Sequence, residues 1–309
     1  MVIICPWCKK EHHIDEKKIP ENVTAARCTS CQKKILLRTG EPGSVDSQKT
    51  VPEKRSNPVR RIAVSLSKGG VGKTTTAVNL AVGLTLAGKK VLLVDTDTQG
   101  QTSFMLGVKP KTGLTELVTG ELTPEETIHK IGDKLSLLAG GRSLAGLKRL
   151  ISRKDFGGEM TMSEALTPLE NQFDYVIMDT SPGWDVLTVN ALFYINEVLV
   201  PVSLEAMTLQ GLTEFLKSVS AIKKYRQELE IKYVLPTFFD RRLKKSEVIL
   251  EKLREIYGTK LCAPIRTNVR VSEAPSSGKT IFEFAPGSPG AEDYRELIRK
   301  IVGDDKLFK

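Results

Sequence analysis

The sequence predicts an α/β fold in which a mostly parallel sheet carries helices on both faces, preceded by a small metal-stapled unit. From about residue 59, short apolar runs alternate with longer stretches whose apolar residues recur at helical spacing. Two Cys-x-x-Cys pairs near the N-terminus predict the small unit. The length of 309 residues suits one large domain or two.

The two cysteine pairs predict a zinc site. Cys5 pairs with Cys8 and Cys28 with Cys31, and nineteen residues separate the pairs. Zn²⁺ accepts four thiolates in a tetrahedral set, and a unit of about 40 residues buries too little core to fold without a staple. We predict a zinc ribbon over residues 1–39. The matched spacing disfavours the alternatives, a redox dithiol pair or disulfides.

The rest of the ribbon predicts no chemistry. Residues 11–14 and 34–38 suit short strands. His12 and His13 could ligate metal, but four thiolates already fill a structural site, so both are interpreted as ordinary surface or strand residues. Lysines of the ribbon could contact nucleic acid or an acidic partner, although a solvated face explains them more simply. Residues 40–58 are almost without apolar side chains and predict a flexible linker.

The large unit, predicted over residues 59–309, opens on a glycine-rich loop between an apolar run at residues 62–66 and an amphipathic stretch at 76–87. Strand, glycine loop and helix form the context of a phosphate-binding loop, because loop N–H groups and a helix N-terminus attract phosphate oxygens. Lys73 would pair with the β- and γ-phosphates of ATP, and the Thr74 hydroxyl would ligate Mg²⁺. The predicted nucleotide-binding residues are Lys68, Gly69, Gly70, Val71, Gly72, Lys73, Thr74 and Thr75.

The loop departs from the standard G-x-x-x-x-G-K-[ST] pattern, because Ser67 takes the first glycine position and a second lysine, Lys68, opens the loop. This deviant Walker A motif resembles the ParA/MinD superfamily of dimerising P-loop NTPases, and within it the ParA/Soj-type partitioning ATPases. In that family the early lysine reaches across a dimer interface to the partner's nucleotide. The resemblance implies that catalytic role for Lys68 in a homodimer.

Two further motifs follow in the order of that family. The apolar run at residues 90–94 ends in Asp95 and Asp97, where open α/β sheets bind ligands. The segment resembles the ParA switch I, D-x-D-P-Q, with Thr98 in the proline position, which implies that Asp97 orients the attacking water and Asp95 supports the Mg²⁺ shell. The run at residues 173–179 ends in Asp179 and resembles a Walker B strand with switch II, so Asp179 would hold a water of the Mg²⁺ shell.

The remaining elements complete the predicted alternation. Residues 113–131 are polar and turn-rich, with one short helix starting near 123–126. Strands are expected at residues 135–139, 197–202 and 231–239, and helices from about 144 to 153, then at 162–171, 207–229, about 246–257 and 292–302. Thr237 and Phe238 are guessed to contact adenine, and Cys262 is interpreted as plain core.

The segment from Asn268 to Pro275 closely resembles the ParA C-terminal motif. ParA proteins bind DNA without sequence preference through basic residues in such regions, and cations on one face would neutralise phosphates. A solvated helix start with a structural arginine is the alternative. The candidate DNA-binding residues are Arg241, Arg242, Lys244, Lys245 and Arg270.

The resemblance implies an ATPase that dimerises on ATP, hydrolyses it slowly with Mg²⁺, and is stimulated by a ParB-like protein or a cargo adaptor. Such a protein binds DNA non-specifically and partitions or positions a chromosome, a plasmid or a protein cargo. A net charge of +9 permits DNA contact. A cytoplasmic location is expected because no secretory signal or membrane-spanning run is evident, and the resemblance implies association with the nucleoid.

Three alternatives are weighed against this reading. A MinD-type membrane-surface ATPase is disfavoured because the apolar stripe of residues 292–302 is short and precedes Asp304 and Asp305, so packing onto the sheet is preferred. A cluster-bearing reductase needs paired cysteines within the ATPase, where Cys262 stands alone. A zinc-ribbon adaptor that only senses nucleotide stays open. The expected cofactors are ATP, Mg²⁺ and Zn²⁺.

Overall fold

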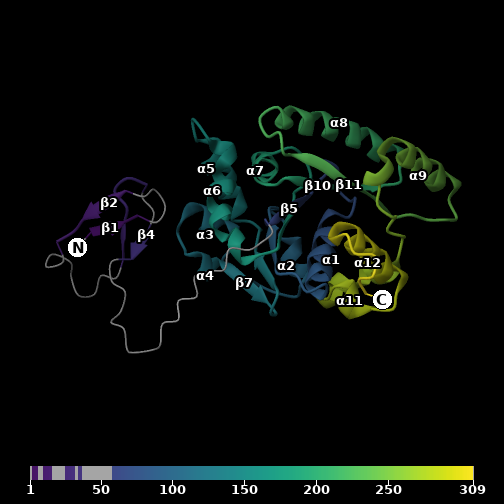
Figure 1. The fold of residues 1–309 in the computed structure, drawn as a ribbon, viewed down its shortest axis with the longest axis horizontal. Coiled ribbons are helices and arrows are strands. Elements are labelled where there is room, and N and C mark those ends of the chain that lie inside the picture. The colour runs from purple at the N-terminus through teal and green to yellow at the C-terminus, as the bar shows by residue number, and fades with distance from the viewer. Residues whose placement is uncertain (1, 6–9, 16–24, 32–33, 37–57, 309) are drawn as a thin grey trace.

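The computed structural model describes residues 2–5, 10–15, 25–31, 34–36 and 58–308 (Figure 1). Of the predicted linker over residues 40–58, all but Pro58 lies outside the described residues. Cys8 lies outside them as well. The predicted boundaries of the ribbon and the linker therefore stay predictions.

The N-terminal unit contains two short antiparallel hairpins. β1 (Val2–Ile4) pairs with β2 (Glu11–His13), and β3 (Ala25–Arg27) pairs with β4 (Lys34–Leu36). The expected strands near residues 11–14 and 34–38 are confirmed as β2 and β4. β1 and β3 were not anticipated from the sequence. Cys5 directly follows β1 and Cys28 directly follows β3, so each hairpin delivers one cysteine from a strand end.

The larger unit is built on a seven-stranded sheet of order β11-β10-β5-β9-β6-β8-β7. Six strands are parallel, and β7 is antiparallel to β8 at one edge. The mostly parallel sheet predicted from the continuous apolar runs is thereby confirmed. The strands are β5 (Arg60–Val64), β6 (Val91–Asp95), β7 (Ile128–Ile131), β8 (Leu135–Leu138), β9 (Tyr175–Asp179), β10 (Glu197–Ser203) and β11 (Glu230–Thr237).

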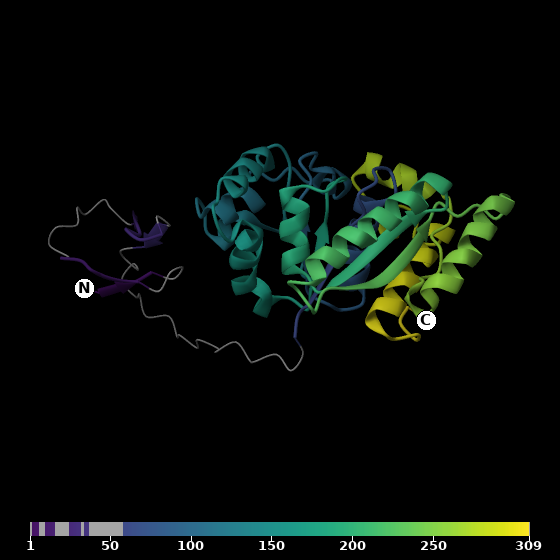
Figure 2. The ribbon, with the colours of Figure 1, turned by 90° about the horizontal axis from the view of Figure 1, so that it is seen from above.

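Both faces of this sheet are buried, as the alternation along β6 shows. Leu92 and Val94 belong to one hydrophobic core, while Val91 and Leu93 belong to the other. The first core is covered by α5 (Leu144–Ser152), α7 (Val186–Tyr194), α8 (Ala206–Lys223) and α9 (Lys244–Tyr257), and the second by α1 (Lys73–Leu86) and α12 (Pro289–Val302). Figure 2 shows α8, in green, lying along β10 and β11. Helices therefore lie on both faces, as predicted.

Several helices and one strand of the large unit were not predicted from the sequence or were predicted with other bounds. The turn-rich stretch 113–131 contains α3 (Leu114–Thr119) and strand β7 besides the expected short helix α4 (Pro124–Thr127). The helix expected at 162–171 is α6 (Thr161–Leu166) followed by a 3₁₀ turn (Thr167–Gln172), and α8 ends at Lys223 rather than 229. Short helices at α2 (Gln101–Met105), α10 (Val269–Glu273) and α11 (Ile281–Phe284) were not predicted either.

Helix α7 was missed although it has a clear start signal. The Asp185 carboxylate accepts hydrogen bonds from the backbone N–H groups of Leu187 and Thr188, at 3.0 and 2.9 Å. This N-cap satisfies two donors that the first turn would leave unpaired. Lys148 lies 2.5 Å from the same carboxylate, and the capping contacts and Lys148 lower the pKa of Asp185 against the opposing effect of its burial.

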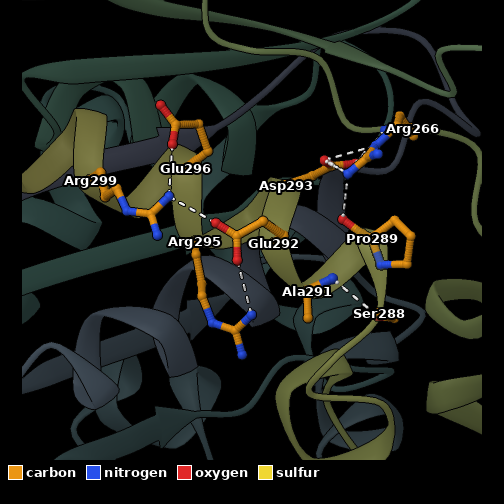
Figure 3. Close-up of polar contacts among 9 residues, drawn as sticks. All are labelled: Arg266, Ser288, Pro289, Ala291, Glu292, Asp293, Arg295, Glu296 and Arg299. Carbon is orange, nitrogen blue, oxygen red and sulfur yellow. Dashed lines mark hydrogen bonds and ion pairs between the residues drawn. The ribbon is translucent and has the colours of Figure 1, made fainter. Parts of the chain in front are cut away.

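The C-terminal helix α12 packs onto the sheet through its apolar side. Tyr294, Leu297, Ile298 and Ile301 are each at most 2% exposed and belong to the core beneath α1. Its other side carries a network of ion pairs (Figure 3), in which Arg299 bonds Glu292 and Glu296 and Arg266 bonds Asp293. No described helix is both long and apolar enough to cross a membrane. The apolar stripe of α12 is thus already used within the fold.

Candidate nucleotide site and zinc ribbon

The predicted site residues meet at the carboxyl ends of β5, β6 and β9. In the register of these neighbouring strands, Asp179 lies beside Val64 of β5 on one side and beside Asp95 of β6 on the other. The glycine-rich loop follows β5 directly. The structure therefore brings the loop and the two strand-end aspartates together, in the place where open α/β sheets bind ligands.

The loop turns into α1 earlier than the sequence indicated. Helix α1 begins at Lys73, not at residue 76, and Gly72 caps it in the left-handed conformation with φ of 84°. The first N–H groups of the helix therefore belong to the loop residues themselves, which suits an anion. The Lys73 ammonium donates to the Lys68 carbonyl oxygen at 2.6 Å, and it is buried. Burial lowers the pKa of Lys73, while Asp179 and Asp97 oppose that shift.

Asp95 and Asp179 form a fully buried pair of carboxylates. Burial is the main cause of a pKa for Asp95 well above its usual range, with Asp179 adding to the shift. Burial also raises the pKa of Asp179 to about 7, against hydrogen bonds from Thr74 and Thr102 that lower it. Among the described residues, Asp95 Oδ2 and Asp179 Oδ1 accept no hydrogen bond.

The charges of this site fit a divalent cation. Asp97 and Asp179 act on Lys73 and Asp95 acts with Asp179, so the ionised site has three carboxylates to one ammonium in a buried place. Two carboxylate oxygens without a partner and a nearby threonine hydroxyl are the hard oxygen donors that Mg²⁺ prefers. Thr102 donates to Asp179 Oδ2 at 3.1 Å and was missed in the sequence, although it follows the D-x-D segment within one helical turn of α2.

Asp97 is 9% exposed, whereas Asp95 and Asp179 are fully buried. Its backbone N–H donates to Asp95 Oδ1 at 2.8 Å, and its own Oδ1 accepts from the N–H of Gln99 at 3.0 Å. The Gly100 N–H donates to the Asp97 carbonyl at 3.1 Å. The turn in which Thr98 stands is therefore closed by the Asp97 side chain and by the Gly100 N–H.

Gly140 packs closely against Asp95 and was not among the predicted site residues. A Cβ placed on it would lie 2.8 Å from the Asp95 carboxylate carbon and 2.8 Å from the Asp95 carbonyl oxygen. We expect Gly140→Ala to displace Asp95 and to lower ATPase activity at least about tenfold, because angstrom-scale misplacement of a site group costs that much or more. Gly146→Ala in α5 is the matched control, since nothing lies within 4 Å of the added Cβ. Equal activity of the two variants would contradict this packing role.

The raised pKa of Asp179 predicts a pH dependence of stability. A carboxyl group whose pKa rises on folding, here from 3.8 to about 7, favours the folded state when protonated, so its contribution is lost as pH rises through that interval. At pH 8 without nucleotide, Asp179→Asn should therefore melt a few degrees higher than the wild type, on a scale of roughly 2–4 °C per kcal/mol. The difference should shrink as pH falls towards 4. A lower melting temperature of the variant at pH 8 would contradict this account.

A small cavity adjoins the end of the loop at Gly72. It measures about 160 Å³ and is lined by Gly72, Thr75, Thr237 and Phe238 together with residues of the 265–275 segment. Thr237 Oγ1 donates to the Val71 carbonyl at 3.0 Å, which ties the end of β11 to the loop. Phe238 has a φ of 55°, an uncommon conformation for an aromatic residue. The position suits the base of a nucleotide whose phosphates lie on the loop.

Lys68, the first lysine of the loop, differs from Lys73 in its contacts. Among the described residues, no hydrogen bond or ion pair involves its ammonium, and the side chain is half-buried. Its Cβ lies 3.8 Å from where a Cβ on Gly211 of α8 would stand. The Gly183 N–H donates to the Ser67 carbonyl at 2.8 Å, so the predicted switch II contacts the loop beside Lys68.

The candidate DNA-binding residues lie on two adjacent exposed segments. The Thr267 N–H donates to the Phe239 carbonyl at 3.0 Å, which sets the start of one basic segment beside the other. Arg242 lies 2.7 Å from Asp240, and Arg270 lies 3.1 Å from Glu273. The other three candidates are Arg241, Lys244 and Lys245. All three are exposed, and none of them forms an ion pair with any residue that the structure describes.

The N-terminal unit gathers three of the four predicted zinc cysteines. The sulfurs of Cys5, Cys28 and Cys31 lie within 4.8 Å of one another, and none forms a disulfide. Three sulfurs at this separation fit a tetrahedral zinc set. His12 lies in β2, as expected of a strand residue, and its Nε2 also lies 3.1 Å from Cys28 Sγ, a contact that the sequence did not predict. Cys262 is 2% exposed, burial raises its pKa to about 12, and its interpretation as core is confirmed.

Known proteins share these features. A family model described as an AAA domain matches residues 59–231, and a zinc-ribbon domain model matches residues 1–36. The chromosome-partitioning ATPase Soj of Thermus thermophilus is 38% identical over 246 residues, covering 79% of this chain and 96% of the relative. The chromosome partitioning protein ParA of Caulobacter vibrioides is 33% identical over 262 residues, covering 81% and 97%.

A solved structure is also similar to this chain in sequence and fold. Cobyrinic acid a,c-diamide synthase of Mycobacterium smegmatis, with bound ATP analog and magnesium, is 30% identical with a TM-score of 0.70 over 81% of this chain and 97% of that chain. With the loop, the strand-end aspartates and the ribbon cysteines in place, the chain belongs to the ParA/Soj family of P-loop ATPases and carries a zinc-ribbon domain at its N-terminus.

Proposed function

We propose that this protein is a partitioning or positioning ATPase that dimerises when it binds ATP and then holds DNA without sequence preference. The observation that carries the proposal is the difference in contacts between the two lysines of the loop. Lys73 is buried against its own loop, whereas the ammonium of Lys68 has no partner among the described residues. A second lysine that the chain's own site does not use is available to the nucleotide of a second copy.

The proposed hydrolytic site uses residues of the chain in distinct roles. Lys73 and the loop N–H groups bind the phosphates, and Thr74, Asp95 and Asp179 hold Mg²⁺ directly or through its water. Mg²⁺, when bound, supplies positive charge to the phosphate oxygens. Asp97 orients the attacking water. The cavity beside Gly72, Thr237 and Phe238 accepts the base.

The proposed DNA surface consists of the two adjacent basic segments, 241–245 and 266–270. Exposed cations bind DNA by neutralising phosphates and releasing counterions. Arg241, Lys244 and Lys245 carry more of this interaction than Arg242 and Arg270, because these two have carboxylate partners within the chain. A location on the nucleoid would follow from such binding.

A double substitution tests this surface. In the ATP state, replacing both Lys244 and Lys245 with alanine should weaken DNA binding and reduce the slope of log affinity against log salt by about 2, or about 1 per lost phosphate contact. Lys130→Ala with Lys134→Ala is the control, since these exposed lysines lie near β7, at the sheet edge opposite β11. An unchanged slope in the first variant, or an equal loss in the control, would move the interface elsewhere.

The remaining parts of the proposal concern the ribbon and the cargo. The three gathered cysteines, with Cys8, would bind Zn²⁺, and the ribbon would recruit a ParB-like or cargo-adaptor protein that stimulates hydrolysis. Soj of Thermus thermophilus and ParA of Caulobacter vibrioides, two relatives of this chain, are named for chromosome partitioning. A membrane-surface role finds little support, because the apolar residues of α12 are buried in the core.

Sedimentation velocity with ADP and with a non-hydrolysable ATP analog, each with Mg²⁺, tests the proposed switch. We expect a monomer with ADP and a dimer with the analog. A monomer in both states would overturn the dimer proposal and favour the nucleotide-sensing adaptor. Co-flotation with anionic liposomes in place of DNA binding would favour the membrane alternative.

A further inference from the structure

The zinc ribbon contains a contact between a histidine and a cysteine that the spacing of its cysteines does not predict. His12 in β2 places Nε2 at 3.1 Å from Sγ of Cys28, a residue that follows β3 in the other hairpin. The side chain is half-buried, while its neighbour His13 is exposed, as expected for successive residues of a strand. The contact therefore joins the two hairpins at the sulfur of a predicted zinc ligand.

The geometry favours His12 as a hydrogen-bond donor over His12 as a metal ligand. The three described sulfurs lie within 4.8 Å of one another, and His12 is not part of that group. A zinc-bound cysteine is a thiolate, which only accepts hydrogen bonds, so the Nε2 facing it must carry the proton. Cys28 Sγ also accepts from the backbone N–H groups of Ser30 and Cys31, at 3.4 and 3.5 Å.

We infer that His12 is a positioning residue of the zinc site, whose Nε2–H holds the Cys28 thiolate in place and disperses its charge. The inference rests on the proposed zinc site. Four thiolates around one divalent ion leave a surplus of negative charge, and each N–H donor to sulfur reduces the tendency of that thiolate to leave the metal. Partners of metal ligands typically contribute about 10–100-fold in metal affinity.

Two substitutions of His12 distinguish the effect of its N–H donor from the effect of its aromatic ring. His12→Phe keeps an aromatic ring but removes the donor, and His12→Gln removes the ring but offers an amide N–H. In the full-length protein, we expect His12→Phe to transfer zinc to a chromogenic chelator about tenfold faster than the wild type. His12→Gln should recover most of the difference. His13→Phe is the matched control and should release zinc at the wild-type rate.

Cobalt substitution provides a readout that ring packing alone would not change. Losing a hydrogen bond to sulfur raises the energy of its lone pairs, so the sulfur-to-cobalt charge-transfer band should move to lower energy in His12→Phe and not in His12→Gln or His13→Phe. Visible bands typical of tetrahedral cobalt would show that the site still forms.

The outcomes distinguish the inference from the proposal beneath it. A wild-type protein that binds neither zinc nor cobalt would overturn the zinc proposal itself. Zinc-loaded wild type with His12→Phe at the wild-type release rate would overturn only the role of His12. Loss of metal from both His12→Phe and His12→Gln would assign the effect to the imidazole ring and likewise overturn the donor role, whereas loss from His12→Phe alone would support it.

Discussion

Asp97→Asn is expected to lower steady-state ATP hydrolysis by about 10²–10³-fold while leaving ATP binding nearly unchanged. Asp97 is 9% exposed, and it is the one with access to solvent among Asp95, Asp97 and Asp179. Asparagine keeps the oxygen that accepts from the Gln99 N–H, so the turn is preserved. What it removes is the negative charge that would orient the attacking water.

Comparison with alanine separates chemistry from turn structure. Asp97→Ala removes the charge and the Gln99 contact, so it should be at least as inactive as Asp97→Asn. If asparagine supported near-wild-type turnover and alanine did not, Asp97 would shape the turn and not act on water. Asp133→Ala, at an exposed turn between β7 and β8, is the control and should hydrolyse ATP normally. Binding of a fluorescent ATP analog checks that every variant still loads nucleotide.

Lys68→Ala is expected to abolish the nucleotide-dependent dimer and to lower hydrolysis about 10²-fold or more, because one missing cationic donor to a developing phosphate charge costs that much. ATP binding to the monomer should remain, since Lys73 and the loop N–H groups are intact. Lys73→Ala should instead lose nucleotide binding itself. Lys217→Ala, at an exposed position of α8, is the control and should dimerise normally.

Mixing two inactive variants tests whether Lys68 acts across the interface. A mixed dimer of Lys68→Ala and Asp97→Asn chains contains one site with its own Asp97 and with Lys68 supplied by the other copy. Hydrolysis should therefore recover to a substantial fraction of the wild-type rate. If Lys68 served the site of its own chain, each site in the mixed dimer would still lack one group, and mixing would restore nothing.

Much of the fold was predictable because continuous apolar runs and glycine-rich turns are local signals. The runs ending at Asp95 and Asp179 identified the two strands, although their adjacency in the sheet depends on topology that no single run encodes. Edge strand β7 was missed because its four residues include a histidine and a lysine and it has only one neighbour. Helix α7 was missed although Asp185 offers a capping signal.

The site residues that belong to a sequence motif could be predicted. Those that reach the site only through packing in the folded chain could not. The loop, Asp95, Asp97 and Asp179 follow from residue pattern and converge in the structure as expected. Gly140 lies against Asp95, and Thr102 donates to Asp179. In each pair the two residues are far apart in the chain, so no local pattern joins them. The contact of His12 with Cys28 was not predicted for the same reason, because the two residues lie sixteen positions apart and in different hairpins.

Binding to a DNA duplex of unrelated sequence, measured with ADP, with an ATP analog and with Lys68→Ala in the analog across a salt series, tests the central claim most directly. The account predicts binding of the wild type with the analog alone, loss of that binding at high salt, and no binding by Lys68→Ala. Equal binding with ADP and with the analog, or full binding by Lys68→Ala, would contradict an ATP-dependent dimer that holds DNA.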